Sequence, residues 1–216
     1  MTFFTRIVQD TGTGLALQEV LYGFIMAMLF IVAASIGLIE VQTNTDVIIL
    51  IVGMNFTWGM IDMIIFYFVD VADQMDQVRT LKGQVPGDRR EKIRGSLSET
   101  IVDLVDEERK QRIIDILTES DVEPTADIKV ERKSMFISAF DCFLLTMLAA
   151  VPAIVCLLII PELRTALTVA GLVSSICMFF IGYYMGPYLG TKGWKSGLSI
   201  LVMAMGITLI ATFTGG

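Results

Sequence analysis

Asp62 and Asp141 each interrupt a long apolar run of the chain. A charge near the centre of a bilayer costs at least ~2.5–3.5 kcal/mol, so a carboxylate in such a run usually marks an ion or proton pathway. Asp62 lies eight residues before Asp70, and Asp141 lies eight residues after Lys133. At 1.5 Å per residue, both aspartates fall roughly 12 Å below the same membrane surface. Two carboxylates at one depth predict an intramembrane cation site.

Further polar side chains share helical faces with these aspartates, because residues three, four and seven apart lie on one side of a helix. We expect the three faces to line one pore, with Glu19 near its mouth and the thioether of Met26 deeper. Met63, beside Asp62, is a further thioether ligand. The three polar faces comprise Glu19, Tyr22, Gly23 and Met26; Asn55, Gly59 and Asp62; and Ser138, Asp141, Cys142 and Thr146.

A structural alternative exists for each of these side chains. Polar residues in membrane helices also hold helices together through hydrogen bonds, and a protonated aspartate does so without transporting anything. The chain has 13 methionines, and methionine commonly fills gaps in an apolar interior. Packing therefore stays open as the role of Met26 and Met63.

The elements that carry these residues are five apolar segments. Hydrophobic residues make up 54% of the chain, above the roughly 45–50% usual for soluble domains. Each segment meets or nearly meets the ~20 residues that a helix needs to cross the hydrocarbon core. The sequence therefore predicts an all-α integral membrane protein with five transmembrane helices. The predicted spans are Val20–Ile39, Val47–Val69, Ser134–Ile160, Thr165–Leu189 and Ser196–Gly216.

Basic residues predict how these helices are oriented. Fifteen of the 16 Lys and Arg residues fall on one side of the predicted membrane, and only Arg164 falls on the other. Because cytoplasmic loops are enriched in basic residues, we expect a cytoplasmic N-terminus and an outside C-terminus. The sequence does not distinguish a cell membrane from a vacuole-type membrane.

The predicted organisation has three parts: spans 1 and 2 with a short N-terminal segment in residues 1–71, a cytoplasmic helical insertion in residues 72–133, and spans 3 to 5 in residues 134–216. The insertion is charged and poor in aromatic residues, and it is punctuated by Gly83, Pro86-Gly87, Gly95 and Pro124. Ser96-Leu97-Ser98-Glu99 has the form of a helix-starting capping box. About sixty residues are few for an independent core. We therefore expect the insertion to pack against a second copy in a homodimer, or to continue the membrane helices.

Acidic residues of the insertion are a second candidate metal site. Asp88, Glu91, Glu99 and Asp103 lie within a short stretch of sequence, and carboxylate oxygens bind divalent cations. The alternative is that they form a solvated helix face, which is the usual role of such charge runs.

Composition excludes several other functions. The net charge of −7 offers no basic surface for nucleic acid. Histidine is absent, which removes the commonest metal ligand and general base. No nucleophile–base pair or phosphate-binding loop is present, so we expect neither an enzyme nor a resident cofactor.

The order of the elements resembles the vacuolar iron transporter family: two spans, a cytoplasmic helical insertion and three spans. Local matches are Ala150-Val151-Pro152, Ile160-Pro161-Glu162-Leu163-Arg164, and the ending Thr212-Phe213-Thr214-Gly215-Gly216. Met63 falls where the family has a metal-contacting methionine. The chain departs from the family at Met26-Ala27, where the family has Asp-Gly, and at Tyr67, where it has a glutamate.

The resemblance implies a homodimer in the lipid bilayer that moves divalent ions out of the cytosol in exchange for protons. Carboxylate and thioether ligands together suit Fe²⁺ or Mn²⁺ better than Mg²⁺, which prefers oxygen ligands and retains its waters. The same carboxylates would exchange protons for the ion. The alternative is a membrane protein that transports nothing and binds a partner through its cytoplasmic insertion.

Overall fold

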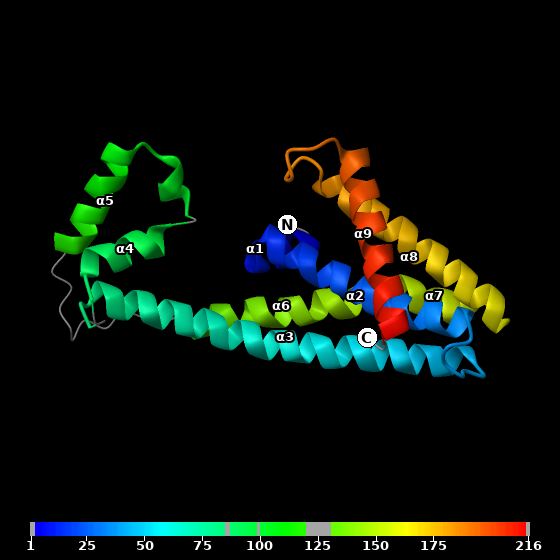
Figure 1. Cartoon of the computed structure of the whole chain (residues 1–216). Helices are drawn as coiled ribbons and strands as arrows, with labels where there is room; N and C mark the ends of the chain where they lie inside the picture. The colour runs from blue at the N-terminus through cyan, green and yellow to red at the C-terminus, as the bar shows by residue number, and fades with distance from the viewer. Residues whose placement is uncertain (1–2, 85–86, 99, 120–130, 215–216) are drawn as a thin grey trace. The chain divides into compact units, whose positions relative to one another are not determined.

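The structure, a computed structural model, describes residues 3–84, 87–98, 100–119 and 131–214. Within these ranges the chain is all-helical (Figure 1). The elements are α1 (Phe3–Thr11), α2 (Thr13–Ser35), α3 (Asn44–Leu81), α4 (Arg89–Leu97), the 3₁₀ helix η1 (Ile101–Leu104), α5 (Glu107–Glu119), α6 (Arg132–Ala149), α7 (Val151–Ile159), α8 (Leu163–Met185) and α9 (Gly193–Thr214).

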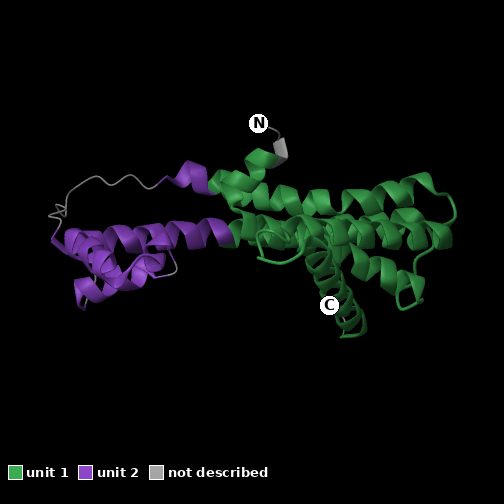
Figure 2. Ribbon diagram, turned by 90° about the horizontal axis from the view of Figure 1, so that it is seen from above, with its two compact units in different colours: residues 1–65, 136–216 green, residues 66–135 purple. Residues whose placement is uncertain are grey.

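Five candidate spans among the described residues confirm the predicted fold class. They are α2, α3, α6 together with α7, α8 and α9, each long and apolar enough to cross a membrane. The short helices α4, η1 and α5 follow the second span, where the sequence predicts a helical insertion. The chain forms two compact units, residues 66–135 and the remainder (Figure 2).

The first span ends earlier than its apolar run. Hydrophobic residues continue to Ile39, but Gly37 adopts a positive φ of 73°. The backbone N–H of Leu38 donates to the Ala33 carbonyl at 2.8 Å, and that of Gly37 donates to Ala34 at 3.2 Å. This bonding pattern is a Schellman motif, which ends a helix at a glycine. Hydrophobicity alone therefore placed this boundary too far along the chain.

The second span belongs to a much longer helix. Helix α3 has 38 residues, about 57 Å at 1.5 Å per residue, whereas the hydrocarbon core is ~30 Å thick. Its charged C-terminal part lies within the second compact unit. Helix α3 thus runs without a break from the second span to Leu81, inside the predicted insertion.

The third span is interrupted between α6 and α7. Helix α6 ends at Ala149, and α7 begins at Val151 with Pro152 in its first turn. Proline has no N–H, so Pro152 cannot donate to the carbonyl one turn earlier. The N–H of Ala150 instead donates to Met147 at 3.3 Å, a tighter i to i+3 bond.

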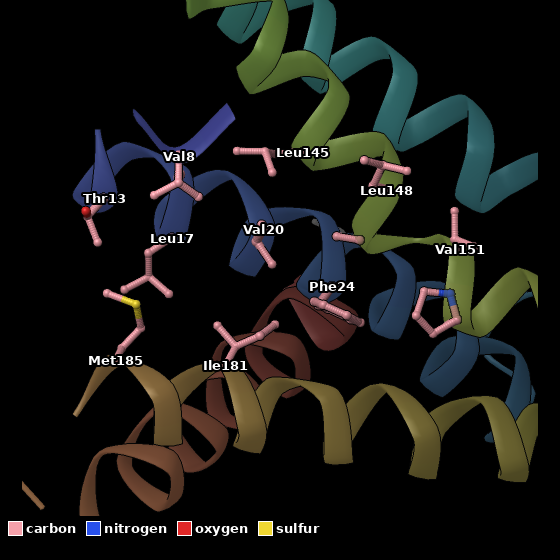
Figure 3. A pocket seen from close by; sticks show the side chains of 13 residues that line it. Val8, Thr13, Leu17, Val20, Phe24, Leu145, Leu148, Val151, Ile181 and Met185 are labelled. Atoms are coloured by element: carbon pink, nitrogen blue, oxygen red, sulfur yellow. The ribbon is translucent and has the colours of Figure 1, made fainter. Parts of the chain in front are cut away.

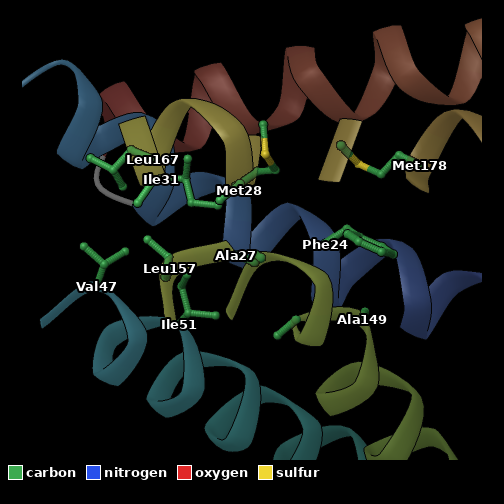
Figure 4. Packing of buried hydrophobic residues seen from close by; sticks show 14 of the residues in the cluster. Phe24, Ala27, Met28, Ile31, Val47, Ile51, Ala149, Leu157, Leu167 and Met178 are labelled. Carbon is green, nitrogen blue, oxygen red and sulfur yellow. The ribbon is translucent and has the colours of Figure 1, made fainter. Parts of the chain in front are cut away.

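Helix α2 packs against both C-terminal helices, α8 and α9, within the first unit. Phe24, Ala27 and Ile31 of α2 belong to the main buried apolar cluster, together with Ile51 of α3 and Leu167 of α8 (Figure 4). Near this cluster, the side-chain amide of Asn44 donates to the Ile160 carbonyl at 2.6 Å. The core thus draws on four spans around α2.

The second unit has its own small interior. Asp88 caps α4 by accepting a hydrogen bond from the Arg90 backbone N–H at 2.9 Å. Arg90 also forms an ion pair of 2.7 Å with Asp115 of α5. Ile93 and Ile114 are buried between these helices. The unit is therefore held by few apolar contacts and several ion pairs.

The capping-box prediction at residues 96–99 is wrong. Ser96 lies inside α4, and Ser98 is the residue that ends this helix. The next elements start elsewhere: Thr100 caps η1, and the Asp106 carboxylate accepts from Arg109 N at the start of α5. Several Ser, Thr and Asp residues in this stretch can cap a helix, and the four-residue motif alone did not select among them.

Helices α8 and α9 approach closely through glycines. A Cβ atom on Gly182 would lie 2.9 Å from Gly197 Cα and 3.0 Å from the Ser196 carbonyl oxygen. Small residues at such contacts let membrane helices pack backbone to backbone. Gly206 of α9, by contrast, would have no heavy atom within 4 Å of an added Cβ.

We therefore expect Gly182→Ala to destabilise the protein by about 1–3 kcal/mol, because the added methyl group forces the two backbones apart. Gly206→Ala is the matched control, since it adds the same methyl group in open space. Thermal unfolding of both variants in detergent, followed by size-exclusion chromatography, checks this. Equal melting temperatures for the two variants would contradict the packing of α8 on α9.

Candidate intramembrane carboxylate site

Glu19 of α2 is the most deeply buried carboxylate among the described residues, with an exposed fraction of 0%. The Thr146 hydroxyl of α6 lies 2.7 Å from Glu19 Oε2. Gly23, one turn after Glu19, makes this contact sterically feasible: a Cβ there would lie 2.5 Å from the Thr146 carbonyl oxygen. Helices α2 and α6 thus meet where α2 has no side chain.

Asn55 of α3 is the third member of the site, and it is fully buried. Its amide nitrogen donates to the Ile51 carbonyl at 2.9 Å. This bond fixes the orientation of the amide group, so Oδ1 points the other way and lies 3.2 Å from the Cβ position of Gly23. Glu19, Asn55 and Thr146, from three helices, therefore surround Gly23.

Two oxygen atoms at this site have no hydrogen-bond partner among the described residues. They are Glu19 Oε1 and Asn55 Oδ1, and both are buried. A buried polar atom without a partner costs ~1–3 kcal/mol and calls for an explanation. Both atoms are acceptors, so neither one satisfies the other. Each of the two oxygen atoms can therefore bind a cation or accept a hydrogen bond from a proton-carrying group.

Asp62 lies on the wall of a neighbouring pocket of about 370 Å³ formed by α2, α3 and α9. It is half-buried, and its charge acts on Glu19. Met26 and Met54 place thioethers on the same wall. The residues that line this pocket are Tyr22, Ile25, Met26, Leu29, Met54, Trp58, Asp62, Ile207 and Ala211.

Asp141 is placed differently from Asp62. It is 1% exposed, and its Oδ1 lies 3.5 Å from Arg6 Nη2 of α1. The carboxyl group of Asp10, also in α1, lies beside it. Asp141 thus already has a cationic partner from the N-terminal helix, whereas Asp62 faces a pocket with methionine ligands.

The other predicted ligands lie apart from this arrangement. Met63 is half-buried on α3, next to Asp62. In the second unit, Asp88 caps α4, Glu91 is exposed in the first turn of that helix, and Asp103 is paired with Lys110. Glu99 lies outside the described residues. Within the described ranges, no three His, Cys, Asp or Glu side chains converge into a metal-binding group.

From the sequence, Asn55 and Thr146 are assigned to polar helix faces but are not predicted as metal ligands. Periodicity assigns a residue to one face of a helix, and it does not say which neighbouring helix that face meets. Met54 and Trp58 were not predicted at all. The glycine at position 23 is the signal that could have located the closest helix contact, because small residues mark such contacts in membranes.

A larger cavity nearby has no such chemistry. It measures about 430 Å³ and is lined by apolar side chains of α1, α2, α6, α7 and α8 together with Thr13 (Figure 3). Val20 and Phe24 of α2 face it opposite Ile181 of α8 (Figure 3). This cavity offers no ligand for an ion, so the polar cluster and the Asp62 pocket form the candidate site.

Comparison with known proteins gives no relative: no family model matches the chain, and no curated protein is significantly similar to it.

The pairing of Asp141 leads to a prediction. Arg6→Gln should destabilise the protein by about 1–2 kcal/mol, because it leaves a buried carboxylate without its cation; the loss stays below the ~3–5 kcal/mol of a fully buried pair because Arg6 is 52% exposed. Adding Asp141→Asn to this variant should restore most of the stability. Thermal unfolding of the single and double variants measures this coupling.

Arg112→Gln is the control, since its ion pair with Glu108 is exposed on both sides. It should leave the melting temperature unchanged. Additive effects of Arg6→Gln and Asp141→Asn would show that the two side chains do not interact.

Proposed function

We propose that this protein is a transporter of divalent transition-metal cations of the Fe²⁺/Mn²⁺ class, which moves them out of the cytosol in exchange for protons. The observation that carries the proposal is the position of Asp62 on the wall of a pocket that also holds Met26 and Met54, beside the fully buried Glu19. A divalent cation that leaves water needs compensating negative charge, and these two carboxylates supply it.

The ligand types favour this class of ion. Carboxylate oxygen is a hard ligand and thioether sulfur a soft one, and their combination suits first-row transition metals better than Mg²⁺. Tyr22 and Trp58, on the same pocket wall, shield the site from lipid with rings that tolerate polar neighbours. Asp62, Met26 and Met54 are therefore the proposed ligands.

Asp141 takes a different role in the proposal than in the hypothesis from sequence, where it shared the cation with Asp62. Its charge is offset by Arg6 at 3.5 Å, so it has less negative charge to offer a metal ion. Of the two aspartates, we therefore propose Asp62 as the one that binds the transported ion. Asp141 anchors α1 to the third span.

The resemblance to the vacuolar iron transporter family supports the same proposal through the order of spans and insertion. The chain carries Glu19 and Asp62 in its first two spans, and we propose that they replace the acidic residues of the family at Met26-Ala27 and Tyr67. By the same resemblance we propose a homodimer. The acidic residues of the second unit are not assigned as ligands.

A second candidate function has one observation in its favour. Ile101 and Leu104 of η1 are 83% and 87% exposed, three residues apart in the unit that the sequence predicts to be cytoplasmic. Exposed apolar side chains of this kind are typical of contact surfaces. The alternative is a membrane protein without transport activity whose insertion binds a partner.

Flux measurements in proteoliposomes test the main proposal. Asp62→Asn keeps the side-chain volume and removes the charge, so it should abolish Fe²⁺ and Mn²⁺ uptake while the protein stays folded. Met26→Leu and Met54→Leu should lower the preference for Fe²⁺ over Mg²⁺ without stopping transport. Asp141→Asn should reduce flux less than Asp62→Asn does.

Met203→Leu is the control for the methionine variants, since Met203 is exposed on α9 and does not line the pocket. Its transport should equal that of the parent. If the parent protein moves neither metal, the transport proposal fails and the partner-binding alternative takes its place.

The proposed orientation is tested by cysteine labelling in a variant that lacks the three native cysteines. Thr43→Cys and Thr165→Cys should react with an impermeant maleimide in intact cells. Thr43 is exposed in the loop before α3, and Thr165 is exposed in the first turn of α8, on the side that carries few basic residues. Ser98→Cys should react only after the cells are lysed. Reaction of Ser98→Cys in intact cells would show that the protein has the opposite orientation.

A further inference from the structure

The hydrogen bonds around Glu19 accommodate two protonation states. Thr146 Oγ1 lies 2.7 Å from Glu19 Oε2 and 3.2 Å from the Cys142 carbonyl oxygen. A hydroxyl group has one hydrogen, so it donates to only one of these oxygens at a time. If Thr146 donates to Cys142, its oxygen remains an acceptor, and Glu19 must then be the donor.

Asn55 supplies a second acceptor for the same proton. Its Nδ2 is committed to Ile51, so Oδ1 can only accept. Glu19 Oε1 and Asn55 Oδ1 are both buried and without a hydrogen-bond partner among the described residues. A carboxyl hydrogen on Glu19 would give a partner to whichever acceptor it faces, whereas an ionised Glu19 leaves Asn55 Oδ1 unsatisfied.

We infer that Glu19 carries an exchangeable proton, held against Asn55 Oδ1 or Thr146 Oγ1, and that this three-residue cluster is a proton site separate from the metal ligands at Asp62. On release, the O–H bond of Glu19 breaks and the electron pair stays on the carboxylate. The proton passes to water. The Thr146 hydroxyl then turns from the Cys142 carbonyl to the carboxylate, so that one hydrogen bond replaces another.

The charged groups around the cluster agree with this assignment. Asp62 of α3 acts on Glu19 with a negative charge, which opposes a second negative charge nearby. Asp141 of α6 is engaged by Arg6 and Asp10 of α1. Arg164 and Lys195, near the starts of α8 and α9, are exposed.

The role of this proton in exchange rests on the proposed function, but its presence is measurable without transport. Infrared spectroscopy of the full-length protein in lipid nanodiscs detects the C=O stretch of a protonated carboxylic acid. At neutral pH the parent should show this band, and Glu19→Gln should lack it. Glu40→Gln removes an exposed carboxylate and should leave the band unchanged.

Two further variants test the acceptors and do not depend on the folding of Glu19→Gln. Asn55→Leu and Thr146→Val each remove one acceptor, so at least one of them should move the band to higher frequency. Thr146→Ser, which keeps the hydroxyl group, should restore the parent frequency. A spectrum without a band that depends on Glu19, or a band that neither variant shifts, would overturn the inference.

The outcome is distinguishable from that of the transport assay. If the parent moves no metal while Glu19→Gln removes the band, the proton site stands and the transport proposal fails. If the parent transports metal without this band, the proton site alone is wrong. In a transporting parent, Glu19→Gln should lose the acceleration of flux by an opposing pH gradient.

Discussion

The close approach of α2 and α6 at Gly23 brings together the polar cluster of Glu19, Asn55 and Thr146. Because position 23 has no side chain, the Thr146 backbone comes near enough for its hydroxyl to lie 2.7 Å from Glu19. The same gap admits the amide oxygen of Asn55 from α3. A carboxylate that would be costly in hydrocarbon thus acquires a polar environment built from three helices. Without this contact, Glu19 would face either lipid or the apolar cluster around Phe24.

The charges of the membrane-spanning segments divide into two groups with different physical environments. Asp141 lies against Arg6 and the N-terminal helix, an arrangement in which charge is already compensated. Glu19 is fully buried, and Asp62 lines the neighbouring pocket together with Met26 and Met54. Two uncompensated carboxylates in a low-dielectric medium favour either protons or a cation. Both proposed sites, the proton at Glu19 and the metal ion at Asp62, follow from this need for positive charge.

The sequence predicted which segments are helical better than it predicted which helices contact one another. Apolar length gave all five spans, because the bilayer thickness imposes that length, and it misplaced the first boundary only because Gly37 ends α2 through backbone conformation. Helical spacing assigned Asn55 and Thr146 to polar helix faces. It did not predict that these faces contact each other, because that contact depends on how helices far apart in sequence pack. The ion pair between Arg6 and Asp141 joins residues 135 positions apart, and no local pattern encodes it.

The break in the third span has a mechanical consequence. Pro152 weakens the helix six residues after Thr146. The residue that follows α7 is tied to α3 by the bond from Asn44 to Ile160. Bending at this break would swing α6 while α7 stays in place. Thr146 would then move relative to Glu19, opening the polar cluster to one side of the membrane. A hinge at Pro152 would therefore act directly on the hydrogen bond between Thr146 and Glu19.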